Sequence, residues 1–156
     1  MVADAVAAGI RPAIFGSGWD RLGLGDLVVS DHLANAELPA VYAAAGVVLN
    51  DHWADMAAHG FVSNRLFDVV ACGTPVVSDA LPELGRLFAG AVVTAEGPDA
   101  VGAAVRAILA EPEAARAAVA EGRAAVLAAH TFDHRAGALR EALERHGLTG
   151  SRDGVA

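Results

Sequence analysis

Two stretches of the chain carry polar side chains whose types and spacing suit ligand binding. The first directly follows a short apolar run that is typical of a strand buried on both faces. The second begins a segment with helical apolar spacing, where free backbone N–H groups and the helix dipole favour an anion such as a diphosphate. The candidates are Asn50, Asp51 and His52 in the first stretch, and Ser63, Asn64, Arg65 and Asp68 in the second.

The residue types in the second stretch suggest individual roles. Arg65 lies in the first predicted helical turn, where a guanidinium can contact phosphate through two N–H groups. Asp68 lies about one turn further along, where a carboxylate can accept hydrogen bonds from hydroxyl groups. The structural alternative is a helix cap with an internal ion pair among these residues.

Three further residues are weaker candidates for the same ligand. Gly16 and Gly18 form half of a dinucleotide-binding fingerprint, but Arg21 stands at the third glycine position, so a dinucleotide site is not favoured. Both glycines suit either a tight turn or a loop close to the ligand. Glu83 follows the predicted strand at 76–78 and is either an acid at a helix start or a second ligand contact.

The sequence does not favour a metal site or lysine chemistry. His52, Asp55 and His59 would share one face of a helix, but no cysteine joins them to complete a zinc site. Every basic residue is arginine, which excludes a Schiff-base lysine and the lysine of a phosphate-binding Walker loop. We therefore expect no metal ligands in this chain.

Composition and charge exclude several classes of function. The 156 residues include 11 basic and 19 acidic side chains, a formal net charge of −8, and 54% apolar residues with a mean hydropathy of +0.42. An acidic chain without a basic cluster is poorly suited to nucleic acid. Its apolar runs fall short of the roughly 20 residues of a membrane span, and Cys72 is the single cysteine. We expect a cytoplasmic protein with no nucleic-acid partner and no membrane span.

The elements that position the candidates alternate between strand and helix patterns. Strands are expected at 12–15, 27–30, 47–49, 76–78 and 91–94, and helices at 3–8, 36–45 with Asn35 as cap, 64–72, 82–88, 99–109, 113–128 and 133–145. A polar loop is expected from 50 to 63.

This order of strands and helices predicts an α/β fold: a Rossmann-like, doubly wound parallel sheet of about five strands, with helices on both faces and a helical C-terminus. We expect one domain at 1–147 and a flexible tail at 148–156. The leading helix has no strand before it, so either the sheet is built without that strand or the chain is a fragment of a longer protein.

The segment from Val47 to Glu83 reads VVLNDHWADMAAHGFVSNRLFDVVACGTPVVSDALPE. It resembles the C-terminal, donor-binding half of GT-B glycosyltransferases of group 1, and through LNDHW and GFVSNRLFD it resembles the CgeB-like branch. In that family two glutamates eight positions apart bracket the helix; the second contacts ribose and the first contacts the donor sugar. Asp68 matches the second position, whereas Gly60 stands at the first, so the resemblance does not identify the sugar.

This resemblance implies a domain that binds a nucleotide diphosphate sugar as donor substrate for glycosyl transfer to an unknown acceptor. It also implies that the helix N-terminus and Arg65 stabilise the charge of the leaving diphosphate in catalysis, and it implies no required cofactor or metal. An N-terminal acceptor-binding domain or partner would complete the enzyme, so the isolated chain should be poorly active. The alternative is a non-catalytic, degenerate nucleotide-binding or assembly module. A sugar-nucleotide epimerase would need more acidic and histidine groups in the crevice.

Overall fold

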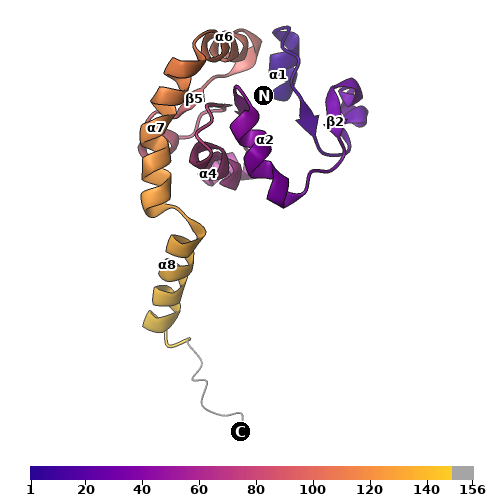
Figure 1. Ribbon diagram of the computed structural model, residues 1–156. Helices are drawn as coiled ribbons and strands as arrows, with labels where there is room; N and C mark the ends of the chain where they lie inside the picture. Colours follow the sequence, from indigo (N-terminus) through magenta and orange to yellow (C-terminus); the bar gives the residue numbers. More distant parts are fainter. Residues whose placement is uncertain (149–156) are drawn as a thin grey trace.

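Parallel strands and helices alternate along the chain in a computed structural model that describes residues 1–148 (Figure 1). Within these residues the strands are β1 (Ile14–Phe15), β2 (Val28–Ser30), β3 (Val48–Asn50), β4 (Val76–Ser78) and β5 (Val92–Thr94). The α-helices are α1 (Val2–Ala7), α2 (Leu38–Ala44), α3 (Ala54–Ala58), α4 (Asn64–Ala71), α5 (Leu84–Phe88), α6 (Gly97–Ala110), α7 (Pro112–Ala129) and α8 (Phe132–Arg145). Short 3₁₀ helices cover η1 (Trp19–Leu22), η2 (Gly25–Leu27) and η3 (Asn35–Glu37).

All strand pairs are parallel, which confirms the predicted α/β class. The three-stranded sheet has the order β3-β4-β5, with Leu49 beside Val77 and Val77 beside Val93. The other two strands, β1 and β2, form a separate parallel pair instead of extending this sheet. β1 has only two residues, and its register with β2 shifts between Ile14 and Phe15, so these strands make a short, irregular ladder.

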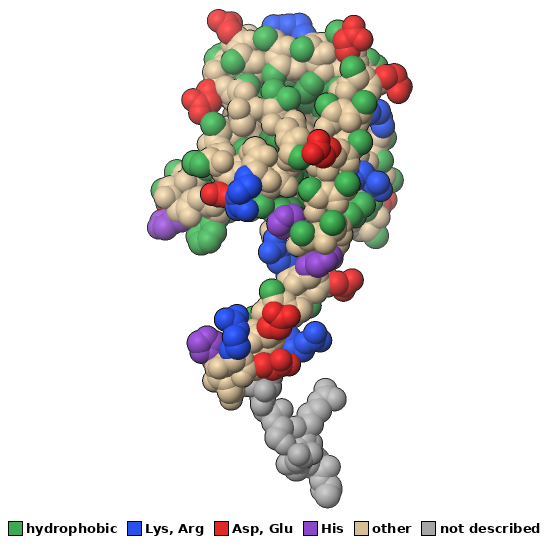
Figure 2. Space-filling view, turned by 90° about the vertical axis from the view of Figure 1, so that its left-hand side faces the viewer, with side chains coloured by type: hydrophobic (Ala, Val, Ile, Leu, Met, Phe, Trp, Pro, Cys, Tyr) green, Lys and Arg blue, Asp and Glu red, His purple; other side chains and the backbone are tan. Residues whose placement is uncertain are grey.

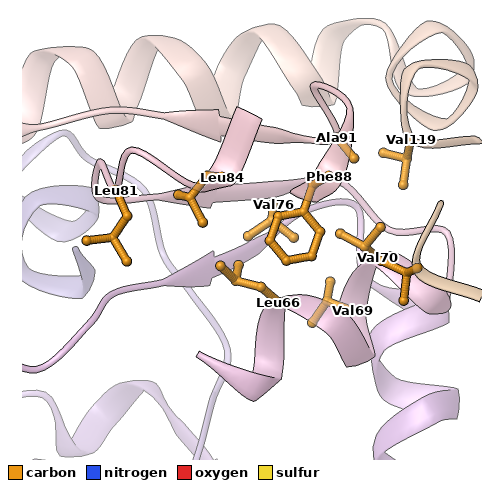
Figure 3. Packing of buried hydrophobic residues seen from close by; sticks show 10 residues of the cluster. Leu66, Val69, Val70, Val76, Leu81, Leu84, Phe88, Ala91 and Val119 are labelled. Atoms are coloured by element: carbon orange, nitrogen blue, oxygen red, sulfur yellow. The ribbon is translucent and has the colours of Figure 1, made fainter. Parts of the chain in front are cut away.

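Helices cover both faces of the three-stranded sheet, as a doubly wound fold requires. Val76 faces a core formed with α4, α5 and α7, whose largest fully buried side chain is Phe88 (Figure 3). Val77 faces a second core formed with α1 and α6, which includes Ala5 and Val101. Because neighbouring side chains of a strand point to opposite faces, β4 is buried on both sides and is the central strand.

α4 connects β3 to β4, and its apolar spacing explains its orientation. Leu66, Val69 and Val70 are fully buried and lie on one face, toward the sheet. The helix ends before Gly73, which has a left-handed φ of 76° that favours glycine. Because β3 and β4 are parallel neighbours, α4 runs back against them, so its N-terminus lies at the carboxyl edge of the sheet.

Two local predictions were wrong. The expected loop at 50–63 contains α3, a five-residue helix without a buried residue, so it lacks the apolar face that periodicity detects. Asn35 does not cap the following helix; it begins η3 instead. The Glu37 carboxylate accepts a hydrogen bond from the backbone N–H of Ala34 at 3.1 Å, which ties the start of η3 together.

The C-terminal helix α8 projects from the body of the molecule (Figures 1 and 2). Thr131 caps it by accepting a hydrogen bond from the backbone N–H of His134, but none of its residues is buried and Phe132 is 81% exposed. Most of the predicted tail, from 149 onward, lies outside the described residues. Within residues 1–148, none of the helices has the length and apolarity required to cross a membrane.

Candidate functional site

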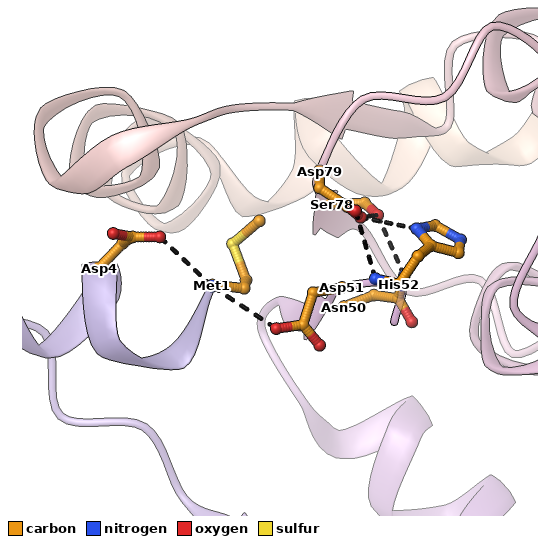
Figure 4. Close-up of polar contacts among 7 residues, drawn as sticks. All are labelled: Met1, Asp4, Asn50, Asp51, His52, Ser78 and Asp79. Atoms are coloured by element: carbon orange, nitrogen blue, oxygen red, sulfur yellow. Dashed lines mark hydrogen bonds and ion pairs between the residues drawn. The ribbon is translucent and has the colours of Figure 1, made fainter. Parts of the chain in front are cut away.

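A chain of polar contacts joins the carboxyl ends of β3 and β4 (Figure 4). The Asn50 side chain, 1% exposed as a residue, donates from Nδ2 to Ser78 Oγ at 3.0 Å. Ser78 Oγ donates in turn to Asp79 Oδ1 at 3.0 Å. The Asp79 carboxylate also accepts from the backbone N–H of His52 through Oδ2 at 3.2 Å and from His52 Nδ1 through Oδ1 at 2.6 Å. One carboxylate thus ties the end of β4 to the segment that follows β3.

The direction of these hydrogen bonds determines where the hydrogens lie. A carboxylate only accepts, so His52 Nδ1 carries a hydrogen, and in the uncharged form of the ring Nε2 then holds a lone pair. The Ser78 hydroxyl gives its single hydrogen to Asp79, so Asn50 must donate its amide N–H to Ser78 and keep Oδ1 as an acceptor. The network therefore leaves two acceptor atoms unused.

These two atoms, Asn50 Oδ1 and His52 Nε2, are buried without a hydrogen-bond partner in the described part of the chain. The His52 side chain is fully buried, whereas the Asp79 side chain is 28% exposed, so the network reaches from the interior to the surface. An unpaired buried acceptor is costly and rare in folded proteins. These two acceptors are therefore candidates for contact with a ligand.

Asp51 lies beside this network but does not join it. Its side chain is 56% exposed, and Oδ2 lies 3.5 Å from the amino group of Met1, which also lies 3.3 Å from Asp4 (Figure 4). The predicted cluster at the end of β3 is thus divided: Asn50 and His52 point into the network, and Asp51 points toward α1.

The first turn of α4 contains the second predicted group. Ser63 occupies the cap position, but its side chain accepts no hydrogen bond from the turn. Leu66 N–H donates to the Ser63 carbonyl oxygen at 3.1 Å, and the N–H groups of Asn64 and Arg65 have no hydrogen-bond partner among the described residues. Both side chains are exposed, and neither Arg65 nor Asp68 forms an ion pair within residues 1–148. The contacts of the structural alternative, a side-chain cap and an internal ion pair, are not made.

Asp68 and Cys72 follow on α4. Partial burial raises the pKa of the Asp68 carboxyl above its usual range. Burial, helped by the negative charge of Asp68 and opposed by Arg123, raises the pKa of the Cys72 thiol. The half-buried Cys72 is therefore in its thiol form at neutral pH and is not an activated nucleophile.

The remaining predicted residues lie in separate places. Gly16, with φ 130°, follows β1 and donates its N–H to Ser30 at 2.9 Å, and Gly18, with φ 88°, begins η1. Both belong to the β1–β2 sheet, which is not hydrogen-bonded to β3-β4-β5. Glu83 precedes α5 and forms an ion pair with Arg86 at 2.6 Å.

An open hollow of about 580 Å³ lies between the segment that follows β4 and the strand β5. It begins at Ala80, directly after Asp79, and runs along β5 from Val92 to Thr94. The lining is mostly apolar: Ala80, Leu81, Pro82, Leu84, Gly85, Val92 and Thr94. One end of the hollow reaches the carboxyl edge of the sheet, where ligands of open α/β folds bind.

The three residues considered as zinc ligands do not converge. His52 Nδ1 is bonded to Asp79, while His59 Nδ1 lies 2.8 Å from the backbone carbonyl oxygen of Asp55. Across residues 1–148, no three His, Cys, Asp or Glu side chains are placed to hold a metal ion.

Ser78 and Asp79 are site residues that sequence reasoning missed. They stand directly after the predicted strand at 76–78, in the same relation to their strand as Asn50 and His52 to theirs. Parallel neighbouring strands end at the same edge, so comparing the polar residues after each strand could have paired them.

Comparison with known proteins defines the class. Residues 1–141 match the model of a protein family described as glycosyl transferase-like, so the chain belongs to that family. Its Rossmann-like α/β fold is also found in sucrose-phosphate synthase from Thermosynechococcus elongatus, with a TM-score of 0.67 and 21% sequence identity over 95% of this chain. The chain spans 42% of the length of that protein. A comparison with curated proteins gives no significant match.

Proposed function

We propose that the chain is the donor-binding domain of a GT-B-type glycosyltransferase of the CgeB-like branch, which binds a nucleoside diphosphate sugar and transfers the sugar to an acceptor. The observation that carries this proposal is the first turn of α4. It offers two backbone N–H groups and the Arg65 side chain, free of partners among the described residues, at the carboxyl edge of the sheet. A diphosphate complements such a group of donors.

In this reaction the bond between the anomeric carbon and the diphosphate oxygen breaks, and its electron pair stays on the diphosphate. The acceptor hydroxyl forms the new bond to the anomeric carbon and releases its proton to a base. The charge that develops on the leaving diphosphate faces the N–H groups of Asn64 and Arg65 and the Arg65 guanidinium. Stabilising that charge is the catalytic role proposed for Arg65. The same donors replace a metal ion, so the proposed reaction needs no resident metal or cofactor.

The nucleoside has room on the other side of β4. The pocket between Ala80 and Thr94 has an apolar lining suited to one face of a base. Asp68, exposed on α4, is the proposed acceptor for the ribose hydroxyls. We infer that Glu83 contributes less to the ligand, because its carboxylate is already paired with Arg86.

The acceptor-binding part of the enzyme is proposed to be a second domain N-terminal to this one, or a partner chain. The chain spans 42% of sucrose-phosphate synthase, which leaves room for such a domain in a protein of that size. The chain alone is therefore expected to bind nucleotide while turning over donor slowly.

A thermal-shift screen of the purified chain tests the proposal. The ligands are UDP, GDP, ADP, TDP and their sugar conjugates, with NAD as control. A ligand that binds the folded state raises the midpoint of unfolding according to its occupancy. We expect one nucleoside diphosphate to raise it and the Arg65→Ala variant to lose most of the rise. No shift at millimolar ligand would contradict the proposal and favour a non-catalytic module.

A further inference from the structure

Two buried acceptors at the carboxyl edge have no role in the diphosphate contact. Asn50 Oδ1 and His52 Nε2 lack a partner in the described chain, and both side chains are at least 99% buried. The network around Asp79 uses the Asn50 amide N–H and the His52 Nδ1–H internally, which leaves Asn50 Oδ1 and, in the uncharged form of the ring, His52 Nε2 as acceptors. Any group that pairs with these two atoms must donate a hydrogen bond.

We propose that Asn50 and His52 form a recognition site for hydroxyl groups of the sugar carried by the donor. This inference rests on the proposed function and assigns a part of the ligand that the α4 turn does not contact. A sugar hydroxyl can donate one hydrogen bond to an acceptor of this kind. A specific site of this type discriminates strongly against a sugar that lacks the hydroxyl, because a buried acceptor is then left unpaired.

Other ligand groups fit these acceptors less well. Phosphate and carboxylate groups offer acceptors and carry negative charge, and the Asp79 carboxylate is bonded to His52 directly and to Asn50 through Ser78. A metal ion would need further ligands, and residues 1–148 place no three His, Cys, Asp or Glu side chains together. A neutral group that donates a hydrogen bond fits these atoms better, and the sugar of the proposed donor carries such groups as hydroxyls.

Access to the two atoms requires a small movement, and the chain next to them is suited to it. From 53 to 63, which includes α3, no residue is buried, so little apolar contact holds this stretch in place. By contrast, Asn50 ends β3, which pairs with β4, and Asp79 holds the backbone N–H of His52. The proposed contact therefore requires residues 53–63 to shift while Asn50 and His52 stay in place.

The test separates the sugar from the diphosphate by titration calorimetry on the full chain. The probes are UDP, ADP, GDP and TDP, each compared with its glucose conjugate, together with UDP-N-acetylglucosamine and GDP-mannose. The variant is His52→Asn, because the asparagine amide N–H replaces Nδ1–H toward Asp79 while the Nε2 acceptor is lost. The matched control is His59→Asn, which removes an Nε2 from an exposed histidine whose Nδ1 contacts a backbone carbonyl.

We expect His52→Asn to weaken the best nucleotide sugar about tenfold and to change the affinity for the matching diphosphate less than about twofold. His59→Asn changes neither. Equal weakening of both ligands, or of neither, overturns the inference while leaving the donor domain intact. Failure of the unmodified chain to bind any of the probes overturns both proposals.

A second measurement changes the ligand and leaves the protein unmodified, so it does not depend on folding of the variant. Each hydroxyl of the bound sugar is replaced in turn by fluorine, which cannot donate. At least one such analogue should bind about tenfold more weakly than the parent. The same analogue should lose nothing further in His52→Asn, since the contact is already gone. Analogues that all bind like the parent overturn the inference.

Discussion

Replacing Arg65 by alanine tests the diphosphate site without disturbing the fold. The Arg65 side chain is exposed and makes no hydrogen bond or ion pair with the described residues. Removal of such a side chain changes the free energy of unfolding by no more than about 0.5 kcal/mol. An effect of Arg65→Ala on ligand binding therefore reports the ligand contact itself.

The expected loss follows from the chemistry of the contact. A hydrogen bond between a guanidinium and phosphate contributes about 1.5–3 kcal/mol, which raises the dissociation constant roughly 10- to 150-fold. At a ligand concentration of about 100 times the wild-type dissociation constant, binding stabilises the folded wild-type chain by about 2.7 kcal/mol. At the same concentration the variant gains only about 0.3–1.4 kcal/mol.

Thermal unfolding measures this difference. For a domain of 156 residues, 1 kcal/mol corresponds to about 2–4 °C. The nucleoside diphosphate should therefore raise the wild-type midpoint by roughly 5–11 °C and the variant midpoint by no more than about 6 °C. The control is Arg116→Ala, which removes the same positive charge from an exposed residue of α7. A full shift in Arg65→Ala, or an equal loss in Arg116→Ala, would refute the assignment.

Three further predictions concern the fold and the polar network. Gly122→Ala should destabilise the protein by about 1–3 kcal/mol in chemical denaturation, because a Cβ there would overlap the Phe88 carbonyl oxygen. Asp79→Ala should cost about 1–3 kcal/mol in the same measurement, since it leaves the buried Nδ1–H of His52 unpaired; an unchanged midpoint would contradict the network. Burial raises the pKa of the Asp68 carboxyl in the folded state above its value in the unfolded chain. Protonation of Asp68 therefore stabilises the folded state at pH values below the pKa of the unfolded chain, and this stabilisation is lost as the pH rises through the pKa of the folded state. Asp68→Asn should therefore raise Tm at pH 7 but not near pH 3, and an equal rise at both would contradict this cause.

The sequence predicted the elements whose pattern depends on local burial. The strand at 76–78 and the start of the helix at Asn64 are confirmed, because a short apolar run marks the strand and helical spacing of apolar residues marks the helix. α3 was missed because its exposed residues carry no such pattern. The separation of β1 and β2 from the larger sheet could not be predicted, since strand pairing depends on contacts far apart in the sequence.

The same distinction applies to the candidate site. Asn50 and His52 were predicted as residues at the ligand-binding edge from their place after a strand, and the structure brings them together. Their partner Asp79 lies 27 positions beyond His52, and only the adjacency of β3 and β4 makes the contact. The sequence pattern also did not indicate that Asp51, which stands between Asn50 and His52, turns away from the network toward α1.

The segment from Asn50 to the first turn of α4 has hydrogen-bond acceptors at one end and donors at the other, and this orients the proposed ligand. Asn50 and His52 present acceptors at the start of the segment, and the first turn of α4 presents donors after Ser63. A nucleoside diphosphate sugar carries acceptor oxygens on its phosphates and donor hydroxyls on its sugar. We therefore assign the diphosphate of the proposed ligand to the first turn of α4 and its sugar to the end of β3. The intervening residues 53–63, none of which is buried, would set the spacing of these two proposed subsites.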